Sequence, residues 1–177
     1  MKFETVGTEI VYQGRALTIR RDRVRLPDER IADWDVVQHN GSVILIPLDD
    51  QGNIYFVRQY RHAAGLDLLE LPAGTREPGE DPLACATREI REETGMAADR
   101  IEKIGAFYLA PGYSTELMHV FMATQLRPDP LKGDDDEFLS VETLPAAEAL
   151  RRAESGEFPD CKSLAALLLA RSHLPGA

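Results

Sequence analysis

Three glutamates gathered in one short segment, GTREPGEDPLACATREIREETGM (residues 74–96), have the clearest capacity for chemistry in this chain. If the segment is helical, Glu89 and Glu93 lie one turn apart and Glu92 lies beside them. Carboxylates are hard oxygen ligands that suit Mg²⁺ or Mn²⁺ when water and phosphate complete the coordination. A solvated acidic face is the alternative, because like charges at this spacing cost only about 0.2–0.5 kcal/mol each. Helical spacing alone leaves both interpretations open.

The positions around these glutamates favour the metal site. The segment resembles the Nudix box, the loop–helix–loop signature of Nudix hydrolases, at every fixed position: Gly74, Glu80, Arg88, Glu89, Ile90, Glu92, Glu93, Gly95 and Met96. In that family the box binds divalent cations that hold a diphosphate. The resemblance implies that Glu89 and Glu93 are the principal metal ligands and that Glu92 assists them as a ligand and catalytic residue. It also implies a further ligand in the backbone carbonyl of Ala73.

The same resemblance implies Mg²⁺ as the cofactor, with Mn²⁺ as the alternative. It gives Glu80 and Arg88 a structural role, in which Arg88 holds the glutamates in orientation. Such support matters because a metal site depends on ligands that are aimed before the metal arrives.

Sequence before the box points to one branch of the family. The stretches VRQYRH (57–62) and LLELPAGTREPGE (68–80) resemble ADP-ribose pyrophosphatases, in which Arg61 matches a position that contacts substrate phosphate. A guanidinium is permanently charged and donates two parallel hydrogen bonds to a phosphate. Arg58 is a second candidate, although on an alternating strand it points to the opposite face from Arg61. An ordinary surface arginine is the alternative for both.

Two loops after the box carry further positions of this branch. Pro111, sixteen residues after Gly95, lies in APGYSTE (110–116), and a proline at this offset marks the ADP-ribose branch. Glu116 in the same loop matches a position that contacts substrate in relatives. The loop GDDDEF (133–138) corresponds to the one that supplies the general base, so Asp135 and Glu137 are the candidates. Relatives usually carry glutamate at Asp135, and we therefore favour Glu137 as the base that activates a metal-bound water.

Trp34 is the single tryptophan and lies in the N-terminal part of the chain. Tryptophan can stack on adenine, and some ADP-ribose pyrophosphatases place one here, whereas an ordinary core residue is the alternative. Relatives commonly exchange the N-terminal sheet across a homodimer. The resemblance thus implies a homodimer.

The elements that must position these residues follow from punctuation and periodicity. Strands are expected within 3–26 and over 34–39, 42–48, 54–61, 101–109 and 117–125, and helices over 82–94 and 145–173, the latter interrupted by GEFPD. Asp81 fits an N-cap, Pro82 the first helical position and Gly95 a left-handed C-terminal residue. The first helix should bury Leu83, Ala86, Ile90 and Thr94.

Strands interleaved with helices predict an α/β (α+β) fold. The resemblance makes it a Nudix-type α/β/α sandwich on a mixed sheet, with a small N-terminal antiparallel sheet. We divide the chain into an N-terminal segment, 1–38, and a Nudix hydrolase domain, 39–177.

Composition limits the other classes of function. The formal net charge of −10 argues against nucleic-acid binding, which needs a basic surface, and it means that an anionic substrate requires local arginines or metal ions. No apolar run approaches the length of a membrane span, and residues 1–14 lack a signal-peptide pattern. We expect Cys85 and Cys161 to be buried, reduced thiols, which favours the cytoplasm.

Together these patterns predict a metal-dependent Nudix hydrolase that most resembles an ADP-ribose pyrophosphatase, with AMP and ribose 5-phosphate as products. The same chemistry on another nucleoside diphosphate sugar, such as GDP-mannose, is the nearest alternative. A non-catalytic nucleotide-sugar sensor is an alternative of a different class, although its relatives tend to lose carboxylates of the box.

Overall fold

The computed structural model describes residues 2–15, 17–133 and 138–175. The elements are β1 (Glu4–Gln13), β2 (Thr18–Arg25), β3 (Ile31–Gln38), β4 (Ser42–Pro47), β5 (Asn53–Arg61), β6 (Leu66–Glu70), β7 (Ala73–Thr75), α1 (Pro82–Thr94), β8 (Met96–Tyr108), β9 (Leu117–Pro128), β10 (Leu139–Pro145), α2 (Ala146–Glu154), α3 (Cys161–Leu169) and a 3₁₀ turn, Arg171–His173. Among these elements no helix is long and apolar enough to cross a membrane.

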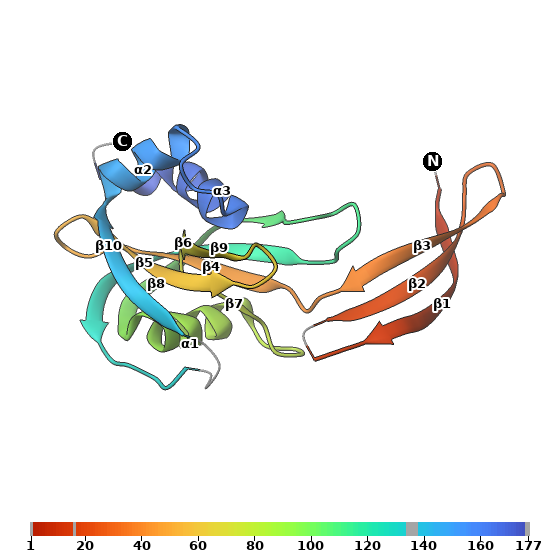
Figure 1. The fold of residues 1–177 in the computed structure, drawn as a ribbon, viewed down its shortest axis with the longest axis horizontal. Coiled ribbons are helices and arrows are strands. Elements are labelled where there is room, and N and C mark those ends of the chain that lie inside the picture. Colours follow the sequence, from red (N-terminus) through yellow and green to blue (C-terminus); the bar gives the residue numbers. More distant parts are fainter. Residues whose placement is uncertain (1, 16, 134–137, 176–177) are drawn as a thin grey trace.

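The three N-terminal strands form an antiparallel sheet of their own, in the order β1-β2-β3, that projects from the rest of the molecule as an arm (Figure 1). One face of the arm carries cross-strand ion pairs, among them Arg21 with Asp35 and Arg23 with Asp33. On the other face the rings of Phe3 and Trp34 lie 5.8 Å apart between centroids, each about half exposed, and Asp22, which pairs with Arg20, lies opposite Trp34 on the neighbouring strand. The expected small N-terminal sheet is confirmed.

The remaining strands form two sheets, β7-β4-β9-β8 and β10-β5-β6. The pairing of β4 with β9 is parallel and the others are antiparallel, so the expected mixed sheet is confirmed. Every residue of β4 is buried, as its continuous apolar run predicts for a strand covered on both faces.

Helices cover both sides of these sheets, with α1 below and α2 and α3 above in Figure 1. A larger apolar cluster, which includes Ile44, Phe56 and Leu167, lies between the sheets and the C-terminal helices, and a smaller one, which includes Leu45 and Ile90, lies under α1. The expected α/β/α sandwich is thereby confirmed. In this sandwich α1 packs against β4, β7 and β8.

The ends of α1 are those the sequence predicts. The Asp81 side chain accepts hydrogen bonds from the first-turn amides, Pro82 occupies the first turn, and Gly95 adopts φ +71° and closes the helix. This cap starts the helix about two turns before Glu89, and so sets the direction in which the glutamates point.

Three expectations differ from the structure. Leu83 is 46% exposed, because it lies in the first turn of α1 and its place in the interface is taken by Cys85. Cys161 is exposed rather than buried, since α3 turns that position away from the sheet at its first residue. The strands β6 and β7 were not expected, because each is short and because the acidic residues of β6 and the glycine of β7 are poor strand formers.

Candidate active site

The carboxylates of α1 lie in the interface between the helix and the sheet. Glu89 is 7% exposed and Glu93 is 4% exposed, although both carry an ionisable carboxyl group. A carboxylate loses its hydration on burial, and this costs several kcal/mol unless a cation or strong donors replace the water. Two such residues one helical turn apart indicate that something stabilises negative charge here.

Arg88 supplies part of that stabilisation. Its Nη1 lies 2.7 Å from a carboxylate oxygen of Glu89 and 2.7 Å from one of Glu92, and its Nε and Nη2 each lie 3.3 Å from the carboxylate of Glu80. Burial lowers the pKa of Arg88, but the pairs with these carboxylates raise the pKa by more than burial lowers it, so the guanidinium stays charged. A planar fork can hold three carboxylates in a fixed relation, which a lysine cannot.

Backbone groups of the box loop complete the arrangement. The Ala73 amide donates a hydrogen bond of 2.9 Å to Glu93, next to the carbonyl that the resemblance makes a metal ligand. At Gly74 a side chain has no room, because an added Cβ would fall inside the Glu89 carboxylate. The glycine therefore lets the chain pass directly over Glu89.

A pocket of about 350 Å³ opens at this point, between the two sheets and the start of α3. Polar groups line most of it, and its lining includes both cations and carboxylates. The lining residues are Ser42, Arg61, Leu68, Glu70, Ala73, Gly74, Thr75, Glu116, Met118, Asp160 and Lys162. The floor at Ala73 and Gly74 brings the pocket to the carboxylates of α1.

Arg61 enters this pocket from the end of β5. Its Nε and Nη2 donate to the Glu70 carboxylate of the neighbouring strand at 3.0 and 2.6 Å. The hydrogen bond to Glu70 raises the pKa of Arg61, so the guanidinium is charged over the whole physiological range. The predicted phosphate-binding arginine thus lies beside the box, held by a carboxylate that is 1% exposed.

Glu116 reaches the same pocket from the loop between β8 and β9. Its carboxylate accepts a hydrogen bond of 2.8 Å from the Ser42 hydroxyl at the start of β4. The loop is itself fixed to the end of β3, since the Val37 amide donates to the Tyr113 carbonyl and the Thr115 amide to the Val37 carbonyl. Residues far apart in sequence, Arg61 and Glu116, therefore line the same pocket.

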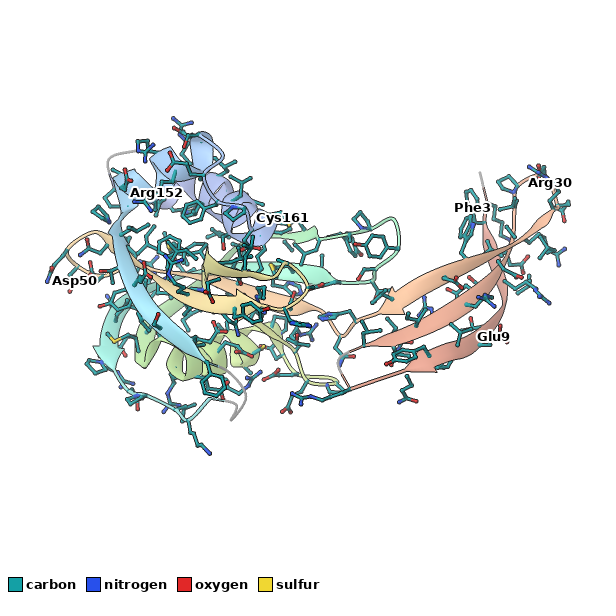
Figure 2. The ribbon with its side chains drawn as sticks, in the orientation of Figure 1. Phe3, Glu9, Arg30, Asp50, Arg152 and Cys161 are labelled. Atoms are coloured by element: carbon teal, nitrogen blue, oxygen red, sulfur yellow. The ribbon has the colours of Figure 1, made fainter. Side chains whose placement is uncertain are left out.

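Other predicted residues lie elsewhere. Arg58 points away from Arg61, as its strand position predicts, and pairs with Glu142 of β10 at 2.5 Å. Pro111 lies exposed in the turn after β8. Trp34 packs on Phe3, which Figure 2 shows near the outer end of the arm, so one chain does not bring this tryptophan to its own pocket.

Asp135 and Glu137, the candidate general bases, lie outside the described residues. The described residues stop at Gly133 and resume at Phe138. A Cβ added to Gly133 would lie 3.7 Å from the backbone carbonyl oxygen of Glu92. The acidic loop thus leaves the described structure next to α1.

Cys85 takes no part in this chemistry as a nucleophile. Burial, together with the carboxylates of Glu89 and Glu80, raises the pKa of the Cys85 thiol to about 12, which keeps it protonated. A protonated thiol is a poor nucleophile.

A second pocket, on the ion-paired face of the N-terminal arm, has different chemistry. It is lined by Arg21 and Arg23, whose charges are balanced by Asp35 and Asp33. Balanced ion pairs at an exposed surface contribute little to binding. We therefore place the candidate site at the box.

The donor set around the box suits a hard divalent cation. Three carboxylates and a backbone carbonyl are the oxygen ligands that Mg²⁺ and Mn²⁺ prefer. Within the described ranges, no three acidic, histidine or cysteine side chains converge in a ready-made cage, because Glu89 and Glu92 turn to Arg88 and Glu93 turns to the Ala73 amide. The residues fit such an ion if side-chain rotation of these glutamates aims them at it.

Sequence reasoning missed Glu70, Lys162 and Ser42. The signal for the first two was present, because each is a single charge in an otherwise apolar segment, LLELPA and CKSLAALLLA. Buried Glu and Lys are rare unless they are paired. Nothing in the sequence marks Ser42, which is an ordinary small residue at the start of a buried strand.

Comparison with known proteins agrees with this geometry. Residues 38–165 match the NUDIX domain, and residues 3–37 match the nucleoside diphosphate sugar hydrolase N-terminal domain. An ADP-ribose pyrophosphatase of Mycobacterium tuberculosis (strain ATCC 25618 / H37Rv) is 38% identical over 98% of this chain and 86% of its own. A GDP-mannose pyrophosphatase of Yersinia pestis (strain Pestoides F) is 34% identical over 76% and 72%.

The fold has a similar counterpart among solved structures. The crystal structure of an ADP compounds hydrolase superposes with a TM-score of 0.87 at 25% identity, covering 99% of this chain and 96% of that one. Both the domain match and the relatives extend over the box and the pocket wall. This chain belongs to the Nudix hydrolase family.

Proposed function

We propose that this enzyme hydrolyses the diphosphate of ADP-ribose to AMP and ribose 5-phosphate in a metal-dependent reaction. The observation that carries the proposal is the placement of two buried carboxylates, Glu89 and Glu93, directly behind the floor of a pocket that also contains Arg61. Carboxylates that can bind a metal cation and an arginine that can bind a phosphate then lie at the same pocket. A diphosphate needs both.

Glu89, Glu93, Glu92 and the Ala73 carbonyl would hold Mg²⁺ or Mn²⁺ in this proposal. When bound, the ion supplies positive charge that offsets the diphosphate and acidifies water. Arg88 maintains the relative orientation of the glutamates through its contacts with Glu89 and Glu92.

The remaining roles fall to residues of the pocket and the acidic loop. Arg61 binds a phosphate oxygen with the part of its guanidinium that faces the pocket, and Glu116 accepts hydrogen bonds from the substrate. Glu137 removes the proton of the attacking water, and Asp135 is its rival for that role. The products leave as two monoanionic or dianionic phosphates, which repel the acidic surroundings of the site.

A substrate panel with metal omitted and restored tests the proposal. The purified chain is incubated with ADP-ribose or GDP-mannose, first after chelation and then with added Mg²⁺. We expect turnover of ADP-ribose only with metal, and a higher kcat/KM for ADP-ribose than for GDP-mannose. A wide margin in favour of GDP-mannose would assign the second substrate instead, which the similarity to a GDP-mannose pyrophosphatase makes the nearest alternative.

A nucleotide-sugar sensor without catalysis is the alternative of a different class. The complete set of box carboxylates and the arginine that orients them speak against it, because binding alone does not require them. The Glu93→Gln variant separates the two. An enzyme loses turnover in this variant, whereas a sensor shows no turnover in the parent chain and retains its affinity for ADP-ribose.

We further propose a cytoplasmic homodimer in which the N-terminal arm of one chain lies over the pocket of the other. The arm projects from the body (Figure 1) and carries the half-exposed aromatic rings of Phe3 and Trp34. Trp34 of the partner subunit could then stack on adenine, which it cannot do within its own chain. Light scattering of the parent and of a Phe3→Glu variant tests the dimer, and a monomeric parent would refute it.

A further inference from the structure

Four side chains of alternating charge form a row that ends at Arg61. The Lys162 ammonium lies 2.5 Å from Glu70 and 2.7 Å from Asp160, and Glu70 in turn accepts from Arg61. These residues come from β5, β6 and the N-terminus of α3. The order along the row is Arg61, Glu70, Lys162, Asp160, so each carboxylate has a cation beside it.

The middle of this row of charges is shielded from water. Glu70 is 1% exposed and Lys162 9%, whereas the Arg61 side chain keeps about two fifths of its surface exposed. Away from water, Lys162 and Arg61 share the Glu70 carboxylate, and each cation changes how strongly Glu70 binds the other cation. Among its described contacts, Arg61 uses Nε and Nη2 for Glu70, and Nη1 has no hydrogen bond there.

Lys162 is fixed in place by the first turn of α3. Asp160 caps the helix by accepting from the Ser163 amide at 3.0 Å and from the Ser163 hydroxyl at 2.5 Å. That hydroxyl also accepts a hydrogen bond of 2.7 Å from the Leu71 amide at the end of β6. Cys161, labelled in Figure 2, marks this turn. The ammonium therefore belongs to a rigid junction and is not a mobile surface lysine.

We propose that Lys162 is a positioning residue for substrate binding, which acts on the diphosphate through Glu70 and Arg61. The inference rests on the proposed function. By sharing Glu70, Lys162 balances part of the charge of that carboxylate, and it keeps Arg61 in the orientation that presents Nη1 to the pocket. If Lys162 is removed, Arg61 is the one cation left beside Glu70 among the described ion pairs, so its guanidinium is drawn toward Glu70 and away from an anionic ligand.

A double-mutant cycle tests this relation. Lys162→Met should raise the KM for ADP-ribose roughly tenfold with kcat nearly unchanged, a coupling typical of side chains in one ion-pair network. In an Arg61→Ala background the same substitution should change KM by less than about twofold, because its intermediary is gone. Lys162→Arg should restore most of the affinity. Arg151→Met, which removes a cation from exposed pairs on α2, is the matched control and should leave KM unchanged.

The outcomes are distinguishable. An equal rise in KM in both backgrounds would mean that Lys162 acts on the substrate independently of Arg61, and an unchanged KM would mean that it does not act at all; either overturns the inference. If Lys162→Met does not fold, Glu70→Gln breaks the same link with a side chain of the same shape and should show the same dependence on Arg61. Should the parent chain hydrolyse no nucleotide sugar, the proposed function fails, and the cycle is decided by calorimetric Kd values for inorganic pyrophosphate.

Discussion

Replacement of Gly74 by alanine is the smallest change that should disable the site. A Cβ at this position would occupy the space of the Glu89 carboxylate, so either the glutamate rotates away or the strand β7 moves. Overpacking of this kind costs about 1–3 kcal/mol. For a chain of this size that corresponds to a fall in Tm of roughly 2–12 °C. A metal ligand displaced by an ångström costs on the order of 10²-fold in rate, and we therefore expect kcat/KM for ADP-ribose to fall about a hundredfold.

Thermal unfolding and steady-state kinetics of Gly74→Ala and its control variants test this prediction. Gly112→Ala is the matched control, because no described heavy atom lies within 4 Å of its added Cβ; its Tm and kcat/KM should equal those of the parent. In a Glu89→Ala background the carboxylate is absent, so Gly74→Ala should cost almost no further stability. If Gly74→Ala is as stable and active as the parent, the close approach of the box glycine to Glu89 does not limit the site.

Three further predictions use the same assays. Arg88→Lys should lower kcat/KM by about 10–100-fold at unchanged KM, since an ammonium cannot bridge the three glutamates; equal activity would remove Arg88 from the support of the site. Glu137→Gln should reduce kcat far more than Asp135→Asn, and the reverse ranking would make Asp135 the base. Burial, with help from two nearby cations, lowers the pKa of His119. The unfolded chain therefore takes up this proton first, and stability falls as the pH drops below about 6.5, so His119→Gln should lose less Tm than the parent between about pH 7 and pH 5; parallel losses would contradict this.

Local signals predicted the parts of the fold that local chemistry determines. The caps of α1 follow from Asp81, Pro82 and Gly95, because each residue type satisfies a specific backbone requirement at a helix end. The buried run of β4 follows from its composition. Leu83 was misplaced because helical periodicity identifies a face and does not say where along the helix the sheet begins to cover it.

Long-range contacts account for what the sequence did not reveal. Glu70 and Lys162 are 92 residues apart and meet because α3 packs its first turn on the end of β6. No periodicity in either segment contains that information, although an unpaired charge in an apolar run signals that a partner exists somewhere. The same limit applies to Trp34, whose distance from the pocket depends on the direction in which the whole arm leaves the body (Figure 1).

Metal affinity of the box tests the central claim most directly. Mn²⁺ binding to the metal-free chain is measured by electron paramagnetic resonance in the presence of a methylene-bridged, non-hydrolysable ADP-ribose analogue. Glu89→Gln and Glu93→Gln should each weaken Mn²⁺ binding by at least about tenfold, and replacement of the partly exposed carboxylate of Glu142 on β10 by Glu142→Gln should leave it unchanged. If both box variants bind Mn²⁺ as tightly as the parent, the buried glutamates of α1 are not the metal ligands.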